Sequence, residues 1–473
     1  MKKIINKIRK HKFTIICGLI PFMIFLLLFF AYYPGIITYD GNNQWQQVQS
    51  GVISNAHPFF STYFMLLLSK LHNTTSIVLL FQMILFSFIW GALCNDLKCS
   101  KKLEVVKICF TILMSFTPII GIYSITLWKD VLYSYYLFSL SVMIFKGINN
   151  GFKYNIIDYI ISGILLALVF SYRHNGMIVS VLFLIIILFI ICKKRKQITK
   201  KTLKNSLMIF LSFVIIIGII AIPKNIILES SQKQIKEQTH YKKEFTISTI
   251  DSYFLWIMGA HITNGNINNI SDLEFLNNII PIEEWKDAYN PYLINDTSLA
   301  KNLDKKFLIN NSKKFRNIFI KYSKKNPGTI ISHYLKSDAL LINPISSRYG
   351  YVYIFSFSEW SSPLGFEAIT NSKLPTVKKI YNKIINYSIR RPLDLLYQPA
   401  LWLYLSIIFS LILSMKVYGK KIWLFIMPMV LNTISLLPIN LAQDLRYVYI
   451  NFLTFFGILI IFIINYKSIM AKK

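Results

Sequence analysis

Long apolar segments, separated by short polar ones, run through most of the chain. A helix rises about 1.5 Å per residue and needs roughly 20 apolar residues to cross a bilayer core, which is close to the length of these segments. We therefore expect about ten membrane-spanning helices, and the pattern predicts an all-α polytopic membrane protein. The approximate ranges of these helices are 13–33, 74–94, 104–127, 130–147, 155–172, 176–192, 206–223, 397–415, 421–438 and 447–466.

The first apolar segment follows a basic N-terminal stretch, as the apolar part of a signal peptide would. It is longer than the apolar region of a typical signal peptide, and Tyr32-Tyr33-Pro34 stands where small residues would mark a cleavage site. We therefore interpret it as a retained membrane helix.

Lysine and arginine gather in every second connection between these segments. The basic clusters lie at 98–102, 146–153, 193–204, 416–421 and 467–473. Each of the short connections on the other side carries a single basic residue: Lys129, Arg173 or Arg446. Because basic residues concentrate in cytoplasmic loops, this asymmetry predicts a multi-pass protein of the cell membrane with both termini in the cytoplasm.

One long segment, 224–396, separates the seventh and eighth expected helices. It is rich in Lys, Asn, Ser and Tyr, with helical patterns near 301–322 and 326–342, and it is too apolar in patches to be a linker. We expect it to form an extracytoplasmic, mostly helical domain. The predicted organisation, in chain order, is a membrane domain of about seven helices (1–223), the extracytoplasmic domain (224–396) and about three C-terminal membrane helices (397–473).

Composition narrows the class of protein further. Hydrophobic residues make up 54% of the chain, and the formal net charge is +31. Orientation signals and attraction to membrane lipids with anionic head groups account for much of this charge, so nucleic acid is not an expected partner. The sequence has 5 Cys, all before residue 193, so no disulfide framework is expected in segment 224–396. The many Ile, Lys and Asn residues suggest an AT-rich bacterial genome.

The segment from Tyr33 to Phe60 follows the first membrane helix and contains no Lys or Arg. Its single acidic residue is Asp40, and it closes on His57-Pro58 before apolar sequence resumes. In so basic a chain, a connection this long without positive charge is typical of the outer side of the membrane. Asp40 is the leading candidate for a catalytic group.

Charged residues near the outer ends of the expected helices form a second pattern. A charge within a membrane costs about 2.5–3.5 kcal/mol on insertion scales, so the few at these ends are informative. A ring of acids and bases at a lipid–water boundary suits a substrate with an anionic head and an apolar tail. Basic groups would bind phosphate oxygens, and a carboxylate would accept a proton from an attacking hydroxyl. The ring comprises Asp40, His57, Lys129, Asp130, Arg173, His174, Asp444 and Arg446.

Four motifs in this order resemble the GT-C glycosyltransferases, multi-helix membrane enzymes that include protein O-mannosyltransferases and the aminoarabinose transferases of lipid A. We identify the chain as similar to a bacterial branch of that superfamily. The resemblance covers the membrane half well and segment 224–396 poorly. The motifs are Asp40 with His57-Pro58 and FFSTYFMLLLSKL, Trp128-Lys129-Asp130-Val131-Leu132, Tyr172-Arg173-His174-Asn175-Gly176, and Arg446-Tyr447.

The resemblance implies inverting transfer of a sugar from a polyprenyl phosphate to a glycan, lipid or protein acceptor of the cell envelope. It implies catalytic roles for Asp40 and Asp130. The family's first acid often has an acidic neighbour, whereas Asp40 is followed by Gly41, so use of a divalent metal is left open. Substrate-binding roles are implied for His57, Lys129, Arg173, His174 and Arg446.

Structural roles remain open for the same residues. Asp40 and Asp130 are suited to cap the helices that follow them, and Asp130 is also suited to pair with Lys129. His57 is also suited to packing or turn formation before Pro58.

The remaining basic residues have similar alternatives. Arg173 can extend to lipid head groups, His174 can be a packing residue, and Arg446 can pair with Asp444.

Two other functions compete with glycosyl transfer. A lipid-linked saccharide flippase would show broken helices, paired repeats and charges at mid-membrane depth, of which the sequence shows little. A non-catalytic envelope scaffold would use the extracytoplasmic domain to bind partners.

Overall fold

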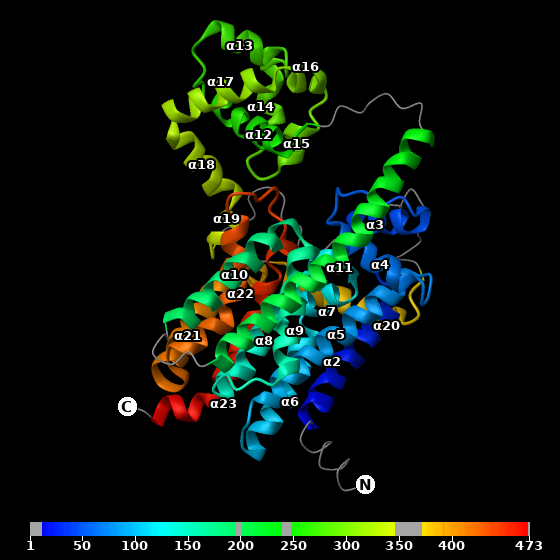
Figure 1. The fold of residues 1–473 in the computed structure, drawn as a ribbon, viewed down its shortest axis with the longest axis vertical. Helices are drawn as coiled ribbons and strands as arrows, with labels where there is room; N and C mark the ends of the chain where they lie inside the picture. Colours follow the sequence, from blue (N-terminus) through cyan, green and yellow to red (C-terminus); the bar gives the residue numbers. More distant parts are fainter. Residues whose placement is uncertain (1–11, 194–199, 239–246, 346–370, 391, 472–473) are drawn as a thin grey trace. The chain divides into compact units, whose positions relative to one another are not determined.

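The computed structural model describes residues 12–193, 200–238, 247–345, 371–390 and 392–471 (Figure 1). The chain forms two compact units. The first unit comprises Met1–Ile235, Ile354–Ser435 and Arg446–Lys473, and the second comprises Lys236–Tyr353 and Leu436–Leu445.

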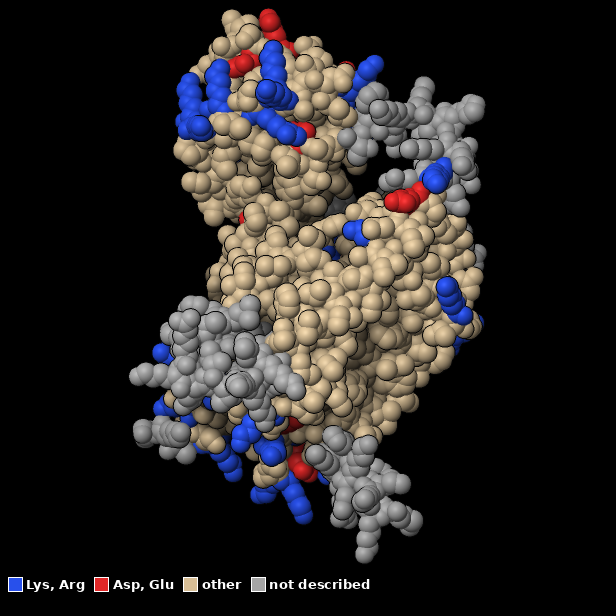
Figure 2. Space-filling view, viewed as in Figure 1, with Lys and Arg blue, Asp and Glu red and all other residues tan. Residues whose placement is uncertain are grey.

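The first unit is a bundle of apolar helices, which confirms the predicted all-α membrane class. Within the described residues, 6 helices are long and apolar enough to cross a membrane, or up to 7 if a bent pair counts as one span. Figure 2 shows a broad band without charged residues across most of the visible face of this unit, with basic side chains near the end where α2 begins and α23 ends. The prediction of about ten crossings also counted shorter apolar helices, and it stays a prediction. The bundle contains α2 (Lys12–Ala31), α5 (Thr75–Asp96), α8 (Lys129–Asn149), α9 (Ile156–Tyr172), α10 (His174–Lys193), α11 (Lys200–Gln238), α21 (Pro399–Leu413), α22 (Trp423–Leu436) and α23 (Ile450–Ala471).

The segment 104–127, expected as one helix, is two helices. α6 (Lys101–Phe116) and α7 (Pro118–Ser124) are bent by 68° at a break where Pro118 begins the second helix. Proline has no N–H to donate and disfavours a helical conformation in the residue before it. The hydroxyl of Tyr381, on α20 (Pro375–Ser388), donates to the carbonyl oxygen of Phe116 at 3.2 Å, close to the break.

A two-stranded parallel sheet lies next to this break. β1 (Ile36–Ile37) pairs with β2 (Thr126–Leu127). β1 leads into α3 (Tyr39–Ser50), and β2 leads into α8. Because the strands are parallel and in register, the N-termini of α3 and α8 lie side by side. The segment expected to be a long loop therefore contains a helix, followed by α4 (Phe59–Ser69).

Side chains hold the junction of α7 with β2 and the junction of β1 with α3. Gln82 of α5 donates through Nε2 to the carbonyl oxygens of Tyr123 and Ser124, both at 2.9 Å, where α7 ends. The Thr38 hydroxyl donates to the carbonyl oxygen of Leu127 at 3.0 Å and accepts the N–H of Gly41 at 3.1 Å. Helix ends leave backbone groups without partners, and these side chains supply them.

Thr38 is therefore the N-cap of α3, and the suggestion that Asp40 caps this helix is wrong. Trp128 occupies the N-cap position of α8 and makes no capping hydrogen bond, so Asp130 is not a cap either. Both acids lie in the first turn of their helices, where the helix dipole favours negative charge. Their carboxylates are free to contact other side chains.

The second unit is helical, as expected, with its own apolar core. Trp285, Leu308 and Phe315 are fully buried in it. The two helical patterns expected near 301–342 correspond to a run of four helices, α16 to α19. The unit comprises α12 (Thr249–Thr263), α13 (Ile270–Asn277), α14 (Trp285–Ala288), α15 (Ile294–Ser298), α16 (Lys305–Asn310), α17 (Ser312–Lys325), α18 (Pro327–Ser337) and α19 (Ala339–Ile342).

The two units divide the chain differently from the expected boundaries. α20 packs in the first unit, because Tyr381 is buried against α2 and α7 there. The loop Leu436–Leu445 belongs to the second unit. In that loop, Asn440 donates to the carbonyl oxygen of Ser337 at 2.7 Å, and the carbonyl oxygen of Leu441 accepts the N–H of Ile294 at 3.0 Å.

The contact between the first turn of α3 and β2 predicts a requirement for glycine at position 41. A Cβ on Gly41 would overlap the carbonyl oxygen of Leu127, a backbone atom that the sheet holds in place. We expect Gly41→Ala to lower the unfolding free energy by about 1–3 kcal/mol and to lower the melting temperature in detergent. Gly218→Ala is the matched control, because no atom lies within 4 Å of a Cβ there. Equal melting temperatures for the two variants would contradict this account of the junction.

Candidate functional site

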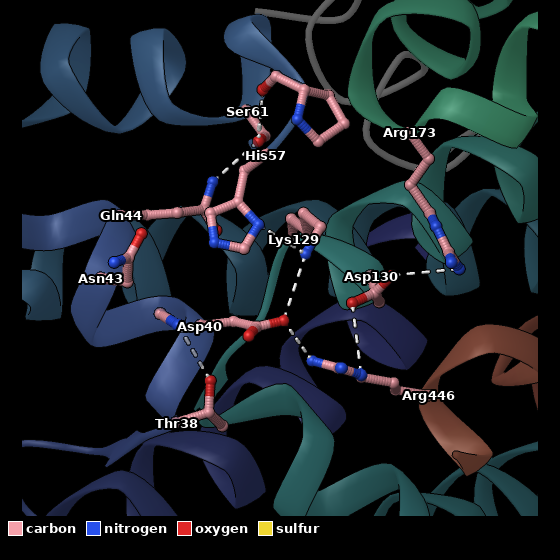
Figure 3. Close-up of polar contacts among 12 residues, drawn as sticks. Thr38, Asp40, Asn43, Gln44, His57, Ser61, Lys129, Asp130, Arg173 and Arg446 are labelled. Carbon is pink, nitrogen blue, oxygen red and sulfur yellow. Dashed lines mark hydrogen bonds and ion pairs between the residues drawn. The ribbon is translucent and has the colours of Figure 1, made fainter. Parts of the chain in front are cut away.

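Charged side chains from distant parts of the chain converge beside the two helix N-termini (Figure 3). Asp40 comes from the first turn of α3, and Lys129 and Asp130 come from the first turn of α8. Arg173 lies between α9 and α10, and Arg446 lies in the 3-10 turn Leu445–Val448 that precedes α23. We call these five residues the charged cluster. All five belong to the first unit.

Asp40 binds two basic groups through one carboxylate oxygen. Its Oδ2 lies 2.6 Å from Nη1 of Arg446 and 3.3 Å from Nζ of Lys129. The same Lys129 Nζ lies 3.3 Å from Nδ1 of His57. Asp40 and His57, which the sequence placed at opposite ends of one connection, are thus joined through Lys129.

Asp130 is the more deeply buried acid, with 1% of its side chain exposed. Its Oδ1 lies 3.0 Å from Nη1 of Arg173, and its Oδ2 lies 3.8 Å from Nε of Arg446. Arg446 therefore contacts both carboxylates. The suggested pairing of Asp130 with Lys129 is wrong, because Lys129 pairs with Asp40 and the partners of Asp130 are Arg173 and Arg446.

Aromatic rings hold the two guanidinium groups. The guanidinium carbon of Arg446 lies 5.1 Å from the ring centre of Trp128 and 5.1 Å from that of Tyr447. The guanidinium carbon of Arg173 lies 4.7 Å from the Tyr447 ring. Cations at these distances are attracted to the faces of aromatic rings. Trp128 is itself buried in this cluster.

A buried amide network lies behind these rings. Oδ1 of Asn432, on α22, accepts hydrogen bonds from the Tyr133 hydroxyl at 3.0 Å and from Nδ2 of Asn175 at 3.1 Å. Nδ2 of Asn432 donates to the carbonyl oxygen of Tyr447 at 3.0 Å. The Tyr133 ring lies 5.5 Å from the guanidinium carbon of Arg173. Asn432 thus forms hydrogen bonds with both Tyr133 and Tyr447, whose rings lie beside the guanidinium groups of Arg173 and Arg446.

A close helix hairpin fixes the position of Arg173. A Cβ on Gly176 would overlap the carbonyl oxygen of Val169. Glycine therefore allows α9 and α10 to approach at their junction, where Arg173 lies. This contact explains why a small residue follows the basic one in this motif.

The charge balance of the cluster favours an anion. Three basic side chains face two carboxylates, which leaves one excess positive charge. Burial and repulsion by Lys129 lower the pKa of His57 to about 4, so this imidazole is neutral near pH 7. The N-termini of α3 and α8 add positive partial charge and backbone donors. The arrangement can bind a phosphate group.

The same basic groups make Asp40 a weak base in this arrangement. Burial opposes its ionisation, but attraction to Lys129 and Arg446 outweighs this and holds the pKa of Asp40 well below its usual range. A carboxylate with so low a pKa accepts a proton poorly. Asp40 can therefore act as a base only when its basic partners contact another anion.

The cluster does not fit a divalent metal. Within the described ranges, no group of three or more His, Cys, Asp and Glu side chains could hold a metal ion. Asp40 and Asp130 contact basic side chains in place of a shared cation.

The structure brings six of the seven expected site residues together. His174, the seventh, is exposed; the charges of Lys129 and Arg173 act on its imidazole, but it forms no hydrogen bond or ion pair with another described residue. Sequence reasoning missed the supports of the site. No sequence pattern identifies Thr38 or Asn432 as part of the site. Asn175 lies within one of the motifs found in the sequence, Tyr172-Arg173-His174-Asn175-Gly176.

Comparison with family models, with curated proteins and with solved structures finds no significant match. The functional assignment therefore depends on the geometry of the charged cluster.

The lowered pKa of His57 predicts a stability change in mild acid. Between pH 6.5 and about 4 the unfolded chain protonates this imidazole and the folded chain does not, so stability falls as the pH falls through that window. We expect His57→Gln to lose less stability than the wild type between pH 7 and pH 4, measured as melting temperature in detergent. His72→Gln, at an exposed histidine, is the control. An unchanged pH dependence in His57→Gln would contradict the assignment.

The amide network predicts a combined loss of stability and anion affinity in Asn432→Leu. This change leaves the buried Tyr133 hydroxyl without its acceptor, at a cost of about 1–3 kcal/mol, and removes one of the two acceptors of Nδ2 of Asn175, which keeps the Ser435 hydroxyl. We expect a lower melting temperature and a smaller stabilisation of the protein by inorganic pyrophosphate. Tyr133→Phe removes a single hydrogen bond and should have a smaller effect. Unchanged pyrophosphate stabilisation in Asn432→Leu would show that the network does not position the arginines.

Proposed function

We propose that this protein is a GT-C-type glycosyltransferase. It transfers a sugar from a polyprenyl phosphate to a hydroxyl of a cell-envelope glycan, lipid or protein on the outer face of the cytoplasmic membrane. The observation that carries the proposal is Arg446, which contacts Asp40 and Asp130 within a cluster that has one excess positive charge. The cluster combines groups that bind phosphate with a carboxylate that can accept a proton.

The donor phosphate binds by exchange of partners. Its oxygens take up charge-assisted hydrogen bonds from Lys129 and Arg446, which otherwise contact Asp40. Asp130 continues to hold Arg173 in place. Once its basic partners face the phosphate, Asp40 loses much of the attraction that lowers its pKa and becomes a better base. Substrate binding thus activates the base.

The transfer step requires one base and no external reactant. The acceptor oxygen attacks the anomeric carbon while its proton passes to a carboxylate oxygen of Asp40. The bond between that carbon and the phosphate oxygen breaks, and its electrons leave with polyprenyl phosphate. Lys129 and Arg446 stabilise the added negative charge on the leaving phosphate. A single displacement inverts the configuration of the sugar.

Replacement of Asp40 by asparagine separates binding from chemistry. We expect Asp40→Asn to reduce sugar transfer from a polyprenyl-phosphate donor in membranes by about 10²–10⁴-fold, the usual range for loss of a general base. Donor affinity should be unchanged or higher, because one negative charge no longer competes for Lys129 and Arg446. Asp287→Asn, at an exposed acid of the second unit, is the control.

Two outcomes would oppose this proposal. Unchanged turnover in Asp40→Asn would remove Asp40 as the base. Movement of a lipid-linked sugar across proteoliposome membranes, without formation of a glycosidic bond, would instead support a transporter.

A further inference from the structure

The amphipathic helix α20 has three different surfaces around its circumference. Tyr381 and Ile385 are buried. Ile380, Ile384 and Tyr387 have exposed fractions of 56%, 46% and 66%. Their spacing of four and three residues puts them on a single stripe of the helix. This exposed apolar stripe borders the buried face.

A basic stripe borders the apolar stripe on its other side. Lys379 and Lys383 each precede an isoleucine of the apolar stripe by one residue, and both are exposed. One residue corresponds to a rotation of about 100° around a helix, so the order of surfaces is buried face, apolar stripe, basic stripe. Within the described part of the chain, neither lysine forms an ion pair with a carboxylate.

Contacts with α2 determine the position of α20 along the axis of that helix. The hydroxyl of Tyr32, the residue directly after α2, donates to the side-chain oxygen of Asn382. The N–H of Lys373 donates to the carbonyl oxygen of Phe30 at 2.9 Å. α20 therefore docks at the C-terminal end of a helix long and apolar enough to cross a membrane. That end is where a span meets the lipid–water boundary.

We propose that α20 lies in the membrane interface and binds phospholipids with anionic head groups. The stripe of Ile380, Ile384 and Tyr387 contacts acyl chains, while Lys379 and Lys383 contact lipid phosphates. An amphipathic helix at a bilayer surface places its apolar stripe and its lysines in this way. The charge of the basic stripe complements an anionic lipid surface. This inference does not depend on glycosyl transfer.

Photocrosslinking in a bilayer tests the lipid contact directly. The full-length protein, with benzoyl-phenylalanine in place of Ile384, is placed in nanodiscs of equimolar phosphatidylglycerol and phosphatidylcholine. After irradiation, mass spectrometry identifies the adducts. We expect lipid adducts with phosphatidylglycerol in excess by about thirtyfold, the order expected for two basic residues at an anionic surface. The same probe at Asn386, on the basic side of the helix, should give few adducts.

Charge reversal tests the role of the lysines. Lys379→Glu with Lys383→Glu should abolish the excess of phosphatidylglycerol adducts at position 384. Lys101→Glu with Lys102→Glu, a reversal of two exposed lysines at the start of α6, should leave it unchanged. If the double glutamate variant does not fold, the double glutamine variant allows the same comparison with a smaller expected loss. Crosslinks to protein in place of lipid, or equal labelling by both lipids without any mutation, would overturn the proposal.

Discussion

The pairing of β1 with β2 is the constraint on which the candidate site depends. The pairing is short, but it joins segments about ninety residues apart, because Ile36 lies opposite Thr126 and Ile37 opposite Leu127. Each strand continues directly into a helix, so the pairing places two helix N-termini side by side. Thr38 donates a hydrogen bond to β2 from the start of α3, and Gln82 donates one to the end of α7, directly before β2. Gly41 allows the first turn of α3 to approach β2 closely. Without this arrangement, Asp40 and Asp130 would not share Arg446.

The electrostatics of the cluster follow from the same arrangement. A buried carboxylate and a partly buried one close together would repel one another, and the cost of burying them falls when basic groups lie between them. Arg446, Lys129 and Arg173 meet this requirement and leave one excess positive charge. The site is therefore stable without a ligand and still attractive to an anion. The low pKa of Asp40 is a consequence of this stabilisation, and it connects the proposed base to the proposed phosphate site.

The boundary between the two units falls directly before Arg446. The loop Leu436–Leu445 belongs to the second unit, where Asn440 and Leu441 form hydrogen bonds. The next residue along the chain is Arg446. Asn432, which precedes that loop and belongs to the first unit, donates to the carbonyl oxygen of Tyr447. Segment boundaries based on hydropathy did not predict this division of the chain.

The sequence by itself determined the class of protein and most of the charged residues of the site. Apolar segments long enough to cross a bilayer predict membrane helices. Charged residues are costly within such helices, so the few that occur at the helix ends are easily recognised. Lys129, Arg173 and Arg446 were such exceptions, and all three lie in the cluster. Each is the single basic residue of a short connection between apolar segments, which made it visible without a structure.

Tertiary structure alone decided which of these residues meet and what supports them. The partners of Asp40 are distant in sequence, and no local pattern encodes a pairing of two-residue strands. The supporting side chains were equally invisible, because Thr38 and Asn432 are ordinary polar residues until a buried carbonyl or hydroxyl lies against them. Hydropathy and charge can be read from the order of residues, whereas hydrogen bonds between distant segments form only when the chain is folded.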